Sequence, residues 1–287
     1  MDEELKGTNE VSSDLRLKEE AEEITKRLEH IRHKILVMSG KGGVGKSSVA
    51  AYLAVSLAGR GYRVGLMDVD LHGPSIPRLL GLKGNLRPSG LGGKPFPIRY
   101  LPKMEVMSIE VLMGDKDAAT IWRGPLKGGI IRQFIANIEW MDLDYLIIDS
   151  PPGTGDEPLT VAQTIPDAKA LIVTTPQEIS LADVRKSINF CRKMNMEILG
   201  LVENMSGLKC PYCGRTIELF KTMGGMVTAK QEKLRLLGSL PIEPEVVRCG
   251  DNGSIDFLGD DSLEYNRAFG QVVDTIEKVL ENKGERA

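Results

Sequence analysis

Eight residues near the start of the chain have the types and spacing of a phosphate-binding loop. Residues 40–47 read Gly-Lys-Gly-Gly-Val-Gly-Lys-Ser, a full match to G-x-x-x-x-G-K-S, and a helical sequence follows at once. The glycines allow a tight turn whose backbone N–H groups point inward at a helix N-terminus. Lys46 is expected to reach the β- and γ-phosphates of ATP, and the Ser47 hydroxyl to ligate Mg²⁺. The predicted nucleotide-binding residues of this P-loop are Gly40, Lys41, Gly42, Gly43, Val44, Gly45, Lys46, Ser47 and Ser48.

Carboxylates follow two later apolar runs, each where a strand is expected to end. Asp68 and Asp70 follow one run, and Asp149 follows another and precedes a Gly-rich turn. The carboxyl ends of parallel strands meet at one edge of a sheet, where α/β proteins bind ligands. We expect Asp149 to contact Mg²⁺, directly or through water, and Gly153 to offer a backbone N–H to the γ-phosphate. For Asp68 and Asp70 the alternative is a strand-capping acid that only binds backbone N–H groups.

The other motif with ligand chemistry is the pair Cys210-Pro-Tyr-Cys213. Cys191 falls in a predicted helix, Cys249 lies 36 residues beyond the pair, and the 3 histidines all precede residue 73, so one chain does not complete a tetrahedral metal site. Two copies would supply four thiolates, enough for a [4Fe–4S] cluster or for Zn²⁺. C-P-Y-C is also a glutaredoxin-type redox sequence, but such a site opens a helix in a small thioredoxin fold, whereas this pair follows a predicted strand.

Seven short apolar runs, separated by helical or turn-rich sequence, are expected to be the strands that carry these residues. The runs are 35–38, 64–67, 106–109, 145–148, 170–174, 198–202 and 236–240. Most lack polar alternation, as parallel strands covered on both faces do. The expected crossover and closing helices are 46–58, 127–138, 181–194 and 263–280. The fold class is therefore α/β, a doubly wound and mainly parallel sheet flanked by helices on both faces.

We expect one ATPase domain over residues 34–287, preceded by a charged helical extension over residues 1–33. The extension carries ten acidic and six basic residues. Its apolar residues share one helix face, which is expected to pack on the domain, with a partner-binding helix as the alternative. They are Leu17, Ala21, Ile24, Leu28 and Ile31. Two stretches interrupt this pattern. Residues 81–102, rich in Gly and Pro, should be irregular, with a short hairpin as an alternative, and residues 206–216, which contain the cysteine pair, should form a loop after the sixth strand.

Composition excludes several classes of function. With 37 basic and 40 acidic residues among 287, the net charge is −3, and the chain lacks the basic excess of a general nucleic-acid binder. No apolar run is long enough to span a membrane, and the N-terminus lacks a secretion signal. Four cysteines do not suggest a disulfide framework. A cytoplasmic protein that acts on neither membrane nor nucleic acid is expected.

The second lysine of the loop gives a family resemblance. G-K-G-G-x-G-K-S resembles the deviant Walker A ATPases, which include MinD, ParA, the arsenite pump ATPase and the nitrogenase iron protein. The resemblance implies that Lys41 reaches the partner subunit's nucleotide in a dimer, that Asp70 positions or deprotonates the attacking water, and that Asp68 helps hold the Mg²⁺ shell. It also places Asn204 and Pro241 at the adenine ring, although an Asx-turn is the alternative for Asn204. The catalytic residues it implies are Lys41, Lys46 and Asp70.

Six segments together resemble the Mrp/ApbC group of iron–sulfur cluster carrier ATPases. They are 40–47, 70–75, 122–125, 149–156, 203–206 and the pair Cys210 and Cys213. The resemblance covers about residues 34–280. It implies slow ATP hydrolysis in a homodimer, a [4Fe–4S] cluster bridged by the two C-x-x-C pairs, and transfer of that cluster to apo-proteins. The cluster donor is not indicated.

The main rival is a MinD/ParA-like positioning ATPase that acts on membrane or DNA. Its membrane-binding members end in a basic amphipathic helix. Residues 263–287 have an apolar face, but five acidic and four basic residues surround it, so an anionic membrane would attract it little. A nitrogenase-type reductase is a third option, but those enzymes take cluster thiolates from separate segments.

Overall fold

The computed structural model describes residues 22–71, 73–82, 96–112, 124–210, 212–220 and 223–284. Several predictions fall outside these ranges: the first part of the N-terminal extension, His72, most of the Gly- and Pro-rich stretch, Trp122, Arg123 and Pro211. In the described residues, no helix combines the length and apolar character needed to cross a lipid bilayer.

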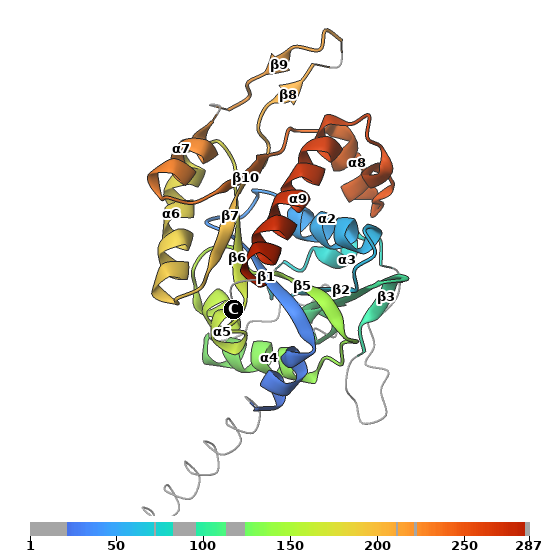
Figure 1. Cartoon of the computed structure of the whole chain (residues 1–287), viewed down its shortest axis with the longest axis vertical. Coiled ribbons are helices and arrows are strands. Elements are labelled where there is room, and N and C mark those ends of the chain that lie inside the picture. Colours follow the sequence, from blue (N-terminus) through green and yellow to red (C-terminus); the bar gives the residue numbers. More distant parts are fainter. Residues whose placement is uncertain are drawn as a thin grey trace, which may run out of the picture.

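An eight-stranded sheet forms the centre of the molecule, in the order β10-β7-β6-β1-β5-β2-β4-β3 (Figure 1). The strands are β1 (Ile31–Ser39), β2 (Val64–Asp68), β3 (Ile98–Leu101), β4 (Met104–Ser108), β5 (Leu143–Asp149), β6 (Lys169–Thr174), β7 (Ile198–Glu203) and β10 (Leu236–Ser239). All neighbours pair in parallel except β3, which runs antiparallel to β4. All seven predicted strands are confirmed, and β3 is the one that the apolar runs did not indicate.

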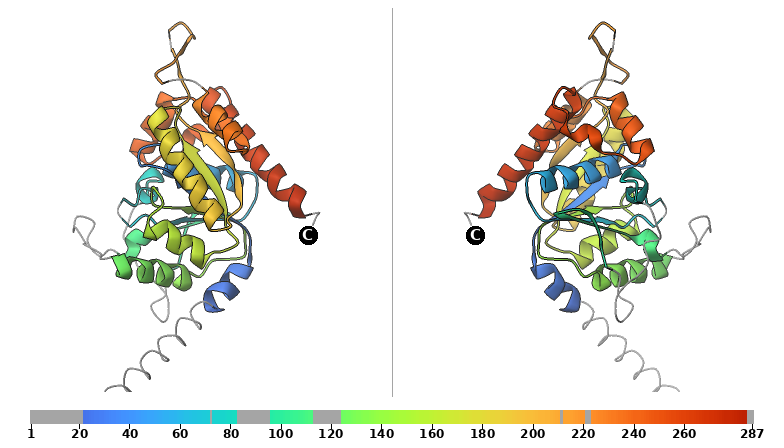
Figure 2. Two further views of the ribbon diagram at one scale, coloured as in Figure 1. Left: turned by 90° about the vertical axis from the view of Figure 1, so that its left-hand side faces the viewer. Right: turned by 90° about the vertical axis from the view of Figure 1, so that its right-hand side faces the viewer.

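Helices cover both faces of the sheet (Figure 2). One face packs against α2 (Lys46–Gly59), α3 (Ile76–Leu79), α8 (Pro244–Asn252) and α9 (Glu264–Gly284). The other packs against α4 (Gly124–Asn137), α5 (Asp156–Thr164), α6 (Glu178–Lys193) and α7 (Gly224–Gln231). Along β1, Ile35 and Val37 enter the first core whereas Leu36 and Met38 enter the second, as side-chain alternation in a strand requires. The doubly wound class is confirmed.

The four predicted helices are present, but the sequence pattern missed the short helices α3, α5, α7 and α8. Each is four to nine residues long. Helices this short have little stability of their own, and packing on the sheet determines them. For α8 a signal was present, since Pro244 occupies its first turn and Gly253 ends it at φ +65°. Two 3₁₀ turns, η1 (Ile109–Leu112) and η2 (Asp256–Gly259), complete the elements.

The described part of the N-terminal extension packs onto the body of the molecule. Residues 22–29 are helical, and Ile24 and Leu28 are buried in the core that lies against α4 and α6. Ile31 is also buried there, but it is already the first residue of β1. The described part of the apolar stripe, Ile24, Leu28 and Ile31, thus packs on the sheet as expected, while Leu17 and Ala21 lie outside the described residues. Strand β1 includes three residues that we had assigned to the extension. The division into an extension and a domain stays a prediction.

The cysteine segment, which we had expected to be a loop, contains two short strands and forms a hairpin. β8 (Leu208–Lys209) pairs antiparallel with β9 (Thr216–Ile217), and the hairpin projects from the body beyond the end of β7 (Figures 1 and 2). The N–H of Gly214 donates to the carbonyl of Cys210 at 2.9 Å, with Gly214 at φ +70°. Because a glycine can adopt this conformation at little cost, the turn closes and its two strands pair.

Candidate functional site

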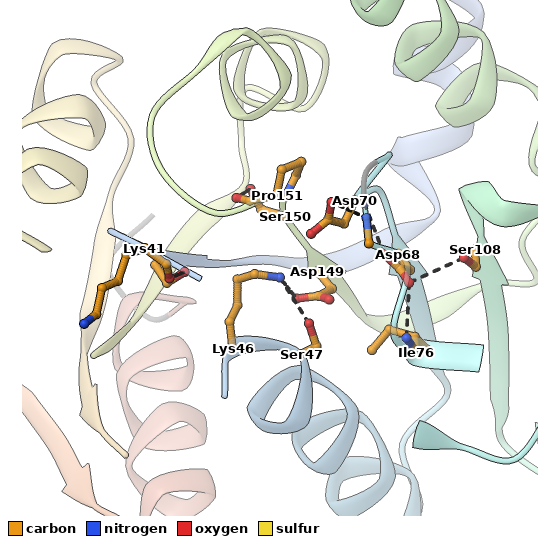
Figure 3. A network of polar contacts seen from close by, with 12 residues as sticks. Lys41, Lys46, Ser47, Asp68, Asp70, Ile76, Ser108, Asp149, Ser150 and Pro151 are labelled. Carbon is orange, nitrogen blue, oxygen red and sulfur yellow. Dashed lines mark hydrogen bonds and ion pairs between the residues drawn. The ribbon is translucent and has the colours of Figure 1, made fainter. Parts of the chain in front are cut away.

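The P-loop, between β1 and α2, brings together a cation, a hydroxyl and a carboxylate (Figure 3). Lys46 Nζ lies 2.5 Å from Asp149 Oδ1 and 3.3 Å from Ser47 Oγ. The side chains of Lys46 and Asp149 are only 6% and 0% exposed. A buried ion pair of this kind costs desolvation energy, which favourable geometry and further partners must offset. The predicted phosphate-binding lysine, Lys46, and Asp149, the last residue of β5, therefore lie in one buried cluster.

Asp149 has the features of a Mg²⁺ ligand. Its Oδ2 is buried and has no hydrogen-bond partner among the described residues. Burial raises the pKa of Asp149, and the adjacent Lys46 ammonium opposes that rise. A divalent cation would stabilise the ionised form, and an unpaired carboxylate oxygen beside a hydroxyl is a donor set that suits Mg²⁺. The residues thus fit the ion, with Ser47 and Asp149 as the groups that would hold it.

Asp68 is the last residue of β2 and Asp70 lies two residues beyond it, and Asp70 accepts a hydrogen bond from the backbone N–H of Gly73 at 3.1 Å. The Asp68 carboxylate accepts hydrogen bonds from the backbone N–H groups of Asp70 and Ile76, at 3.1 and 3.2 Å, and from Ser108 Oγ at 3.4 Å. Burial, with the nearby charge of Asp149, raises the pKa of Asp68 to about 8. These bonds match the strand-capping alternative, and a role in the Mg²⁺ shell stays a prediction. Asp70 lines the cavity, where a water-positioning role remains our expectation.

Lys41 lies apart from this cluster. Its Nζ is 3.3 Å from Oε1 of Gln177, the residue before α6, and its side chain points away from Lys46 and Asp149 (Figure 3). The preceding Gly40 packs directly on α6, because a Cβ there would lie 2.3 Å from the backbone carbon of Asp183. The loop therefore cannot easily shift toward α6. Lys41 lines the cavity over the P-loop, but its Nζ bonds Gln177 rather than the Lys46–Asp149 cluster.

A cavity of about 560 Å³ lies over the P-loop. This volume is in the range of small-molecule sites. Its walls come from the P-loop, the segment after β2, the end of β7, the segment after β10, α8 and α9. Among the residues that line it are Lys41, Gly42, Gly43, Gly45, Lys46, Ser47, Ser48, Tyr52, Asp70, Asn204, Pro241, Ile242, Val246 and Tyr265.

Asn204 is placed at the P-loop by a hydrogen bond. Its Nδ2 donates to the carbonyl of Val44 at 2.9 Å, and a Cβ on Gly45 would lie 2.2 Å from the same nitrogen. Gly45 also has φ +81°, so only glycine fits there without strain. Asn204 thus supports the loop from the side, and its contact with adenine stays a prediction, as does that of Pro241.

The structure brings most of the predicted nucleotide residues to one cavity. Gly40, Val44, Asp68, Asp149 and Gly153 lie outside its lining. The N–H of Gly153 donates to the carbonyl of Ser39 at 2.8 Å, so it is bonded to β1 rather than free toward the cavity. We missed Gln177 and the α8 residues, because contacts distant in sequence bring them to the site. Tyr52 gave no periodic signal, since α2 is buried on nearly all sides.

The two cysteines lie at the turn of the hairpin. Cys213 is exposed, Cys210 is partly exposed, and both are free thiols. The backbone N–H groups of Cys213 and Tyr212 and the side chain of Cys213 hydrogen-bond the Cys210 sulfur, which lowers the pKa of that thiol. Over the described residues no group of three or more His, Cys, Asp and Glu side chains could hold a metal ion. The hairpin thus presents two thiols, with Cys210 polarised, and the described residues offer them no third ligand.

Comparison with protein families agrees with these observations. The family model described as the NUBPL iron-transfer P-loop NTPase, of ParA type, matches residues 30–277. The chain belongs to this family. A protein from Dictyostelium discoideum named cytosolic Fe-S cluster assembly factor NUBP2 homolog is 47% identical over 231 residues, covering 79% of this chain and 87% of that protein. An iron-sulfur cluster carrier protein from Methanocaldococcus jannaschii is 43% identical over 263 residues, covering 91% and 90%.

Solved structures place the fold in the same group. A nucleotide-binding protein from Archaeoglobus fulgidus in complex with ADP is 39% identical, with a TM-score of 0.74 over 85% of this chain and 96% of that one. The cell division ATPase MinD from Pyrococcus furiosus has a TM-score of 0.62 at 22% identity, over 86% and 99%. The second likeness concerns the fold alone. The family resemblance expected from the sequence is confirmed.

Proposed function

We propose that this member of the family is an ATP-dependent iron–sulfur cluster carrier: it binds and hydrolyses ATP, holds a [4Fe–4S] cluster between two copies of itself and transfers it to apo-proteins. The observation that carries the proposal is the pair of free thiols at the hairpin tip, exposed Cys213 and partly exposed, polarised Cys210, on the same chain as a P-loop site. Relatives at 43 and 47% identity are named as a cluster carrier and a cluster assembly factor.

The nucleotide chemistry follows from the buried cluster. Lys46 supplies the positive charge for the β- and γ-phosphates. Ser47 and Asp149 would hold Mg²⁺, which when bound would neutralise the charge that develops in phosphoryl transfer. Asp70, at the cavity wall, orients the attacking water. Asn204 and Pro241 lie against the base. Because the Gly153 N–H is bonded to Ser39, that bond must break before Gly153 can donate to a γ-phosphate, and the turn after β5 is then a switch.

Lys41 acts on the partner's nucleotide. Its side chain is directed outward from its own Lys46 and Asp149 and is held near Gln177, which supports a role across a subunit boundary. A cation that completes the site only in the dimer stabilises the transition state as an arginine finger does. ATP hydrolysis then depends on dimer formation, which is consistent with slow turnover in the free protein.

Two hairpins bring four thiolates to one centre. The lowered pKa of Cys210 favours the thiolate, which is the form that binds metal. Four thiolates suit a [4Fe–4S] cluster, and the same set also suits Zn²⁺. The cluster is cargo in this scheme, because an exposed hairpin tip gives an apo-protein access to it.

A MinD/ParA-like positioning function is less well supported. The apolar face of α9, which would have to enter a membrane, is buried instead: Phe269, Val272, Val273 and Ile276 belong to the core of the sheet. The cysteine hairpin would also have no purpose in that function. We therefore propose a cytoplasmic protein that acts on neither membrane nor nucleic acid, with apo iron–sulfur proteins as recipients.

Anaerobic reconstitution tests the proposal. Wild-type protein should bind four iron and four sulfide per dimer, and Cys213→Ala should reduce both to background. Cys249→Ala is the matched control, because Cys249 is a buried thiol of α8 and should leave the content unchanged. A Cys213→Ala protein that holds as much iron and sulfide as wild type contradicts the ligand assignment, and tight zinc without sulfide contradicts the cluster.

A further inference from the structure

Glu203, the last residue of β7, is a buried carboxylate that the chemistry above does not use. It is 1% exposed. Its Oε2 accepts a hydrogen bond from the N–H of Gly225 at 2.5 Å, and its Oε1 accepts from the hydroxyls of Ser206 and Ser239, at 2.6 and 3.3 Å. An ionised carboxylate is acceptor-only, with two lone pairs on each oxygen, so three convergent donors suit it.

The three donors belong to three different segments. Ser206 is at the root of the cysteine hairpin, Gly225 is in the first turn of α7, and Ser239 ends β10. The contact with α7 is direct, because a Cβ on Gly225 would lie 2.8 Å from Glu203 Oε2. One side chain therefore fixes the hairpin root, α7 and β10 relative to β7, from which the hairpin projects (Figure 1).

The next residue, Asn204, faces the nucleotide cavity, where its side chain bonds the P-loop carbonyl of Val44. The hairpin root is also bonded to the cavity wall. The N–H of Ile242, a lining residue, donates to the carbonyl of Gly207 at 2.7 Å, and the N–H of Ser206 donates to that of Leu240 at 2.8 Å. The end of β7 is thus the place where the nucleotide site and the hairpin share a support.

We propose that Glu203 is a positioning residue that couples nucleotide binding to the cysteine hairpin. A shift of Asn204 or of the segment after β10 on nucleotide binding reaches the hairpin root, because Glu203 ties that root to α7 and β10 as one unit. Without this tie, the two backbone bonds to the segment after β10 still connect the hairpin root to the cavity, but the coupling weakens. The inference rests on the proposed function, since it takes Cys210 and Cys213 as metal ligands.

A cobalt titration measures this coupling. Co²⁺ is added to dimeric full-length protein with and without Mg-ADP, and thiolate-to-cobalt absorption reports binding at the cysteines. In wild type the nucleotide should change the Co²⁺ affinity by about fivefold or more, and Co²⁺ should change the Mg-ADP affinity by the same factor. In Glu203→Ala the change should fall below about twofold, while each ligand alone still binds within about threefold of its wild-type affinity.

Two further variants separate positioning from stability or charge. Glu203→Gln should restore the coupling, because its Oε1 can accept from Gly225 while its amide donates to the two serine hydroxyls, which can turn to accept. Glu197→Ala is the control, because Glu197 directly precedes the other end of β7 and its side chain is partly exposed. This variant should behave as wild type. If Glu203→Ala does not fold, the double variant Ser206→Ala and Ser239→Ala, which leaves the Gly225 bond intact, takes its place and should lose most of the coupling.

The outcomes are distinguishable. Wild type that shows no thiolate absorption with Co²⁺ contradicts the proposed function itself. Wild type that binds Co²⁺ equally with and without Mg-ADP overturns the inference and leaves the proposed function intact. Full coupling in Glu203→Ala, or in the double serine variant, also overturns it.

Discussion

The nucleotide site and the cysteine hairpin differ in how much of each site one chain supplies. At the P-loop, Lys46, Ser47 and Asp149 converge in the interior, with exposed fractions of 6 and 0% for the ion pair. At the hairpin, Tyr212 between the cysteines is 97% exposed, and the described residues offer no third ligand. The first site is pre-organised by folding, whereas in our proposal the second becomes complete only when another chain supplies two more thiolates.

This difference has a physical cause. Buried charges must be paired and hydrogen-bonded at the time of folding, because an unpaired one costs several kcal/mol. Exposed thiols carry no such cost, since water solvates them. A cluster that must leave again is therefore better held at an exposed tip than in the interior, whereas phosphoryl transfer needs groups fixed in advance.

The largest effect is expected from Lys46→Ala. Loss of this cation should lower ATP turnover by about 10³-fold, because no other described group faces the Ser47 hydroxyl and Asp149 with a positive charge. Steady-state phosphate release measures this loss, and Lys186→Ala, which changes an exposed side chain of α6, is the control. Turnover within tenfold of wild type would show that the buried cluster is not the hydrolytic site.

Lys41→Ala tests the part of the nucleotide site that, in our proposal, needs a second chain as the hairpin does. We expect ATP turnover to fall by about 10²-fold with ATP binding nearly unchanged, because Lys41 Nζ bonds Gln177 and points away from Lys46 and Asp149. In an equimolar mixture with Lys46→Ala, each subunit offers what the other lacks, so activity should partly return. No recovery on mixing would contradict a role in trans.

The two regions should also differ in how much they contribute to stability: the buried ion pair should contribute more than the exposed thiol. Asp149→Ala leaves the Lys46 ammonium buried without its partner and should lower the free energy of unfolding by about 3 kcal/mol. Cys213→Ala changes an exposed side chain and should alter it by less than about 0.5 kcal/mol. Urea titration of both proteins without metal measures the contrast, and equal losses would contradict it.

The smallest effect concerns the pH dependence of the hairpin. Hydrogen bonds from the N–H groups of Cys213 and Tyr212 lower the pKa of Cys210, so its thiolate persists to lower pH than that of an ordinary thiol. The variant Cys213→Ser keeps those N–H groups and leaves Cys210 as the thiol of the hairpin. The rate at which Cys210 reacts with iodoacetamide should decline as the pH falls, and the midpoint of that decline should lie at a lower pH in the folded protein than in protein unfolded in urea. Coincident midpoints would show that the folded hairpin does not polarise the sulfur. Mass spectrometry of the Cys210 peptide follows the reaction.

Sequence patterns predicted the nucleotide site better than the cavity around it. The P-loop residues are contiguous, so their chemistry follows from local spacing, and Asp149 follows from its place after an apolar run. The α8 wall, Gln177 beside Lys41 and the bond from Gly153 to Ser39 depend on contacts between distant segments. The cysteine segment was expected to be a loop, and its two strands were missed because strands of two residues have no detectable period.

By itself the sequence determined the type of sheet, the phosphate-binding loop and the presence of two thiols with too few further ligands in one chain to complete a metal site. Each of these depends on residues close together in the chain. Only the tertiary structure decided which carboxylate faces Lys46, which way Lys41 points, and that Glu203 joins the hairpin to α7 and β10. These depend on where strands end relative to one another, and that is set by sheet order and packing rather than by any local pattern.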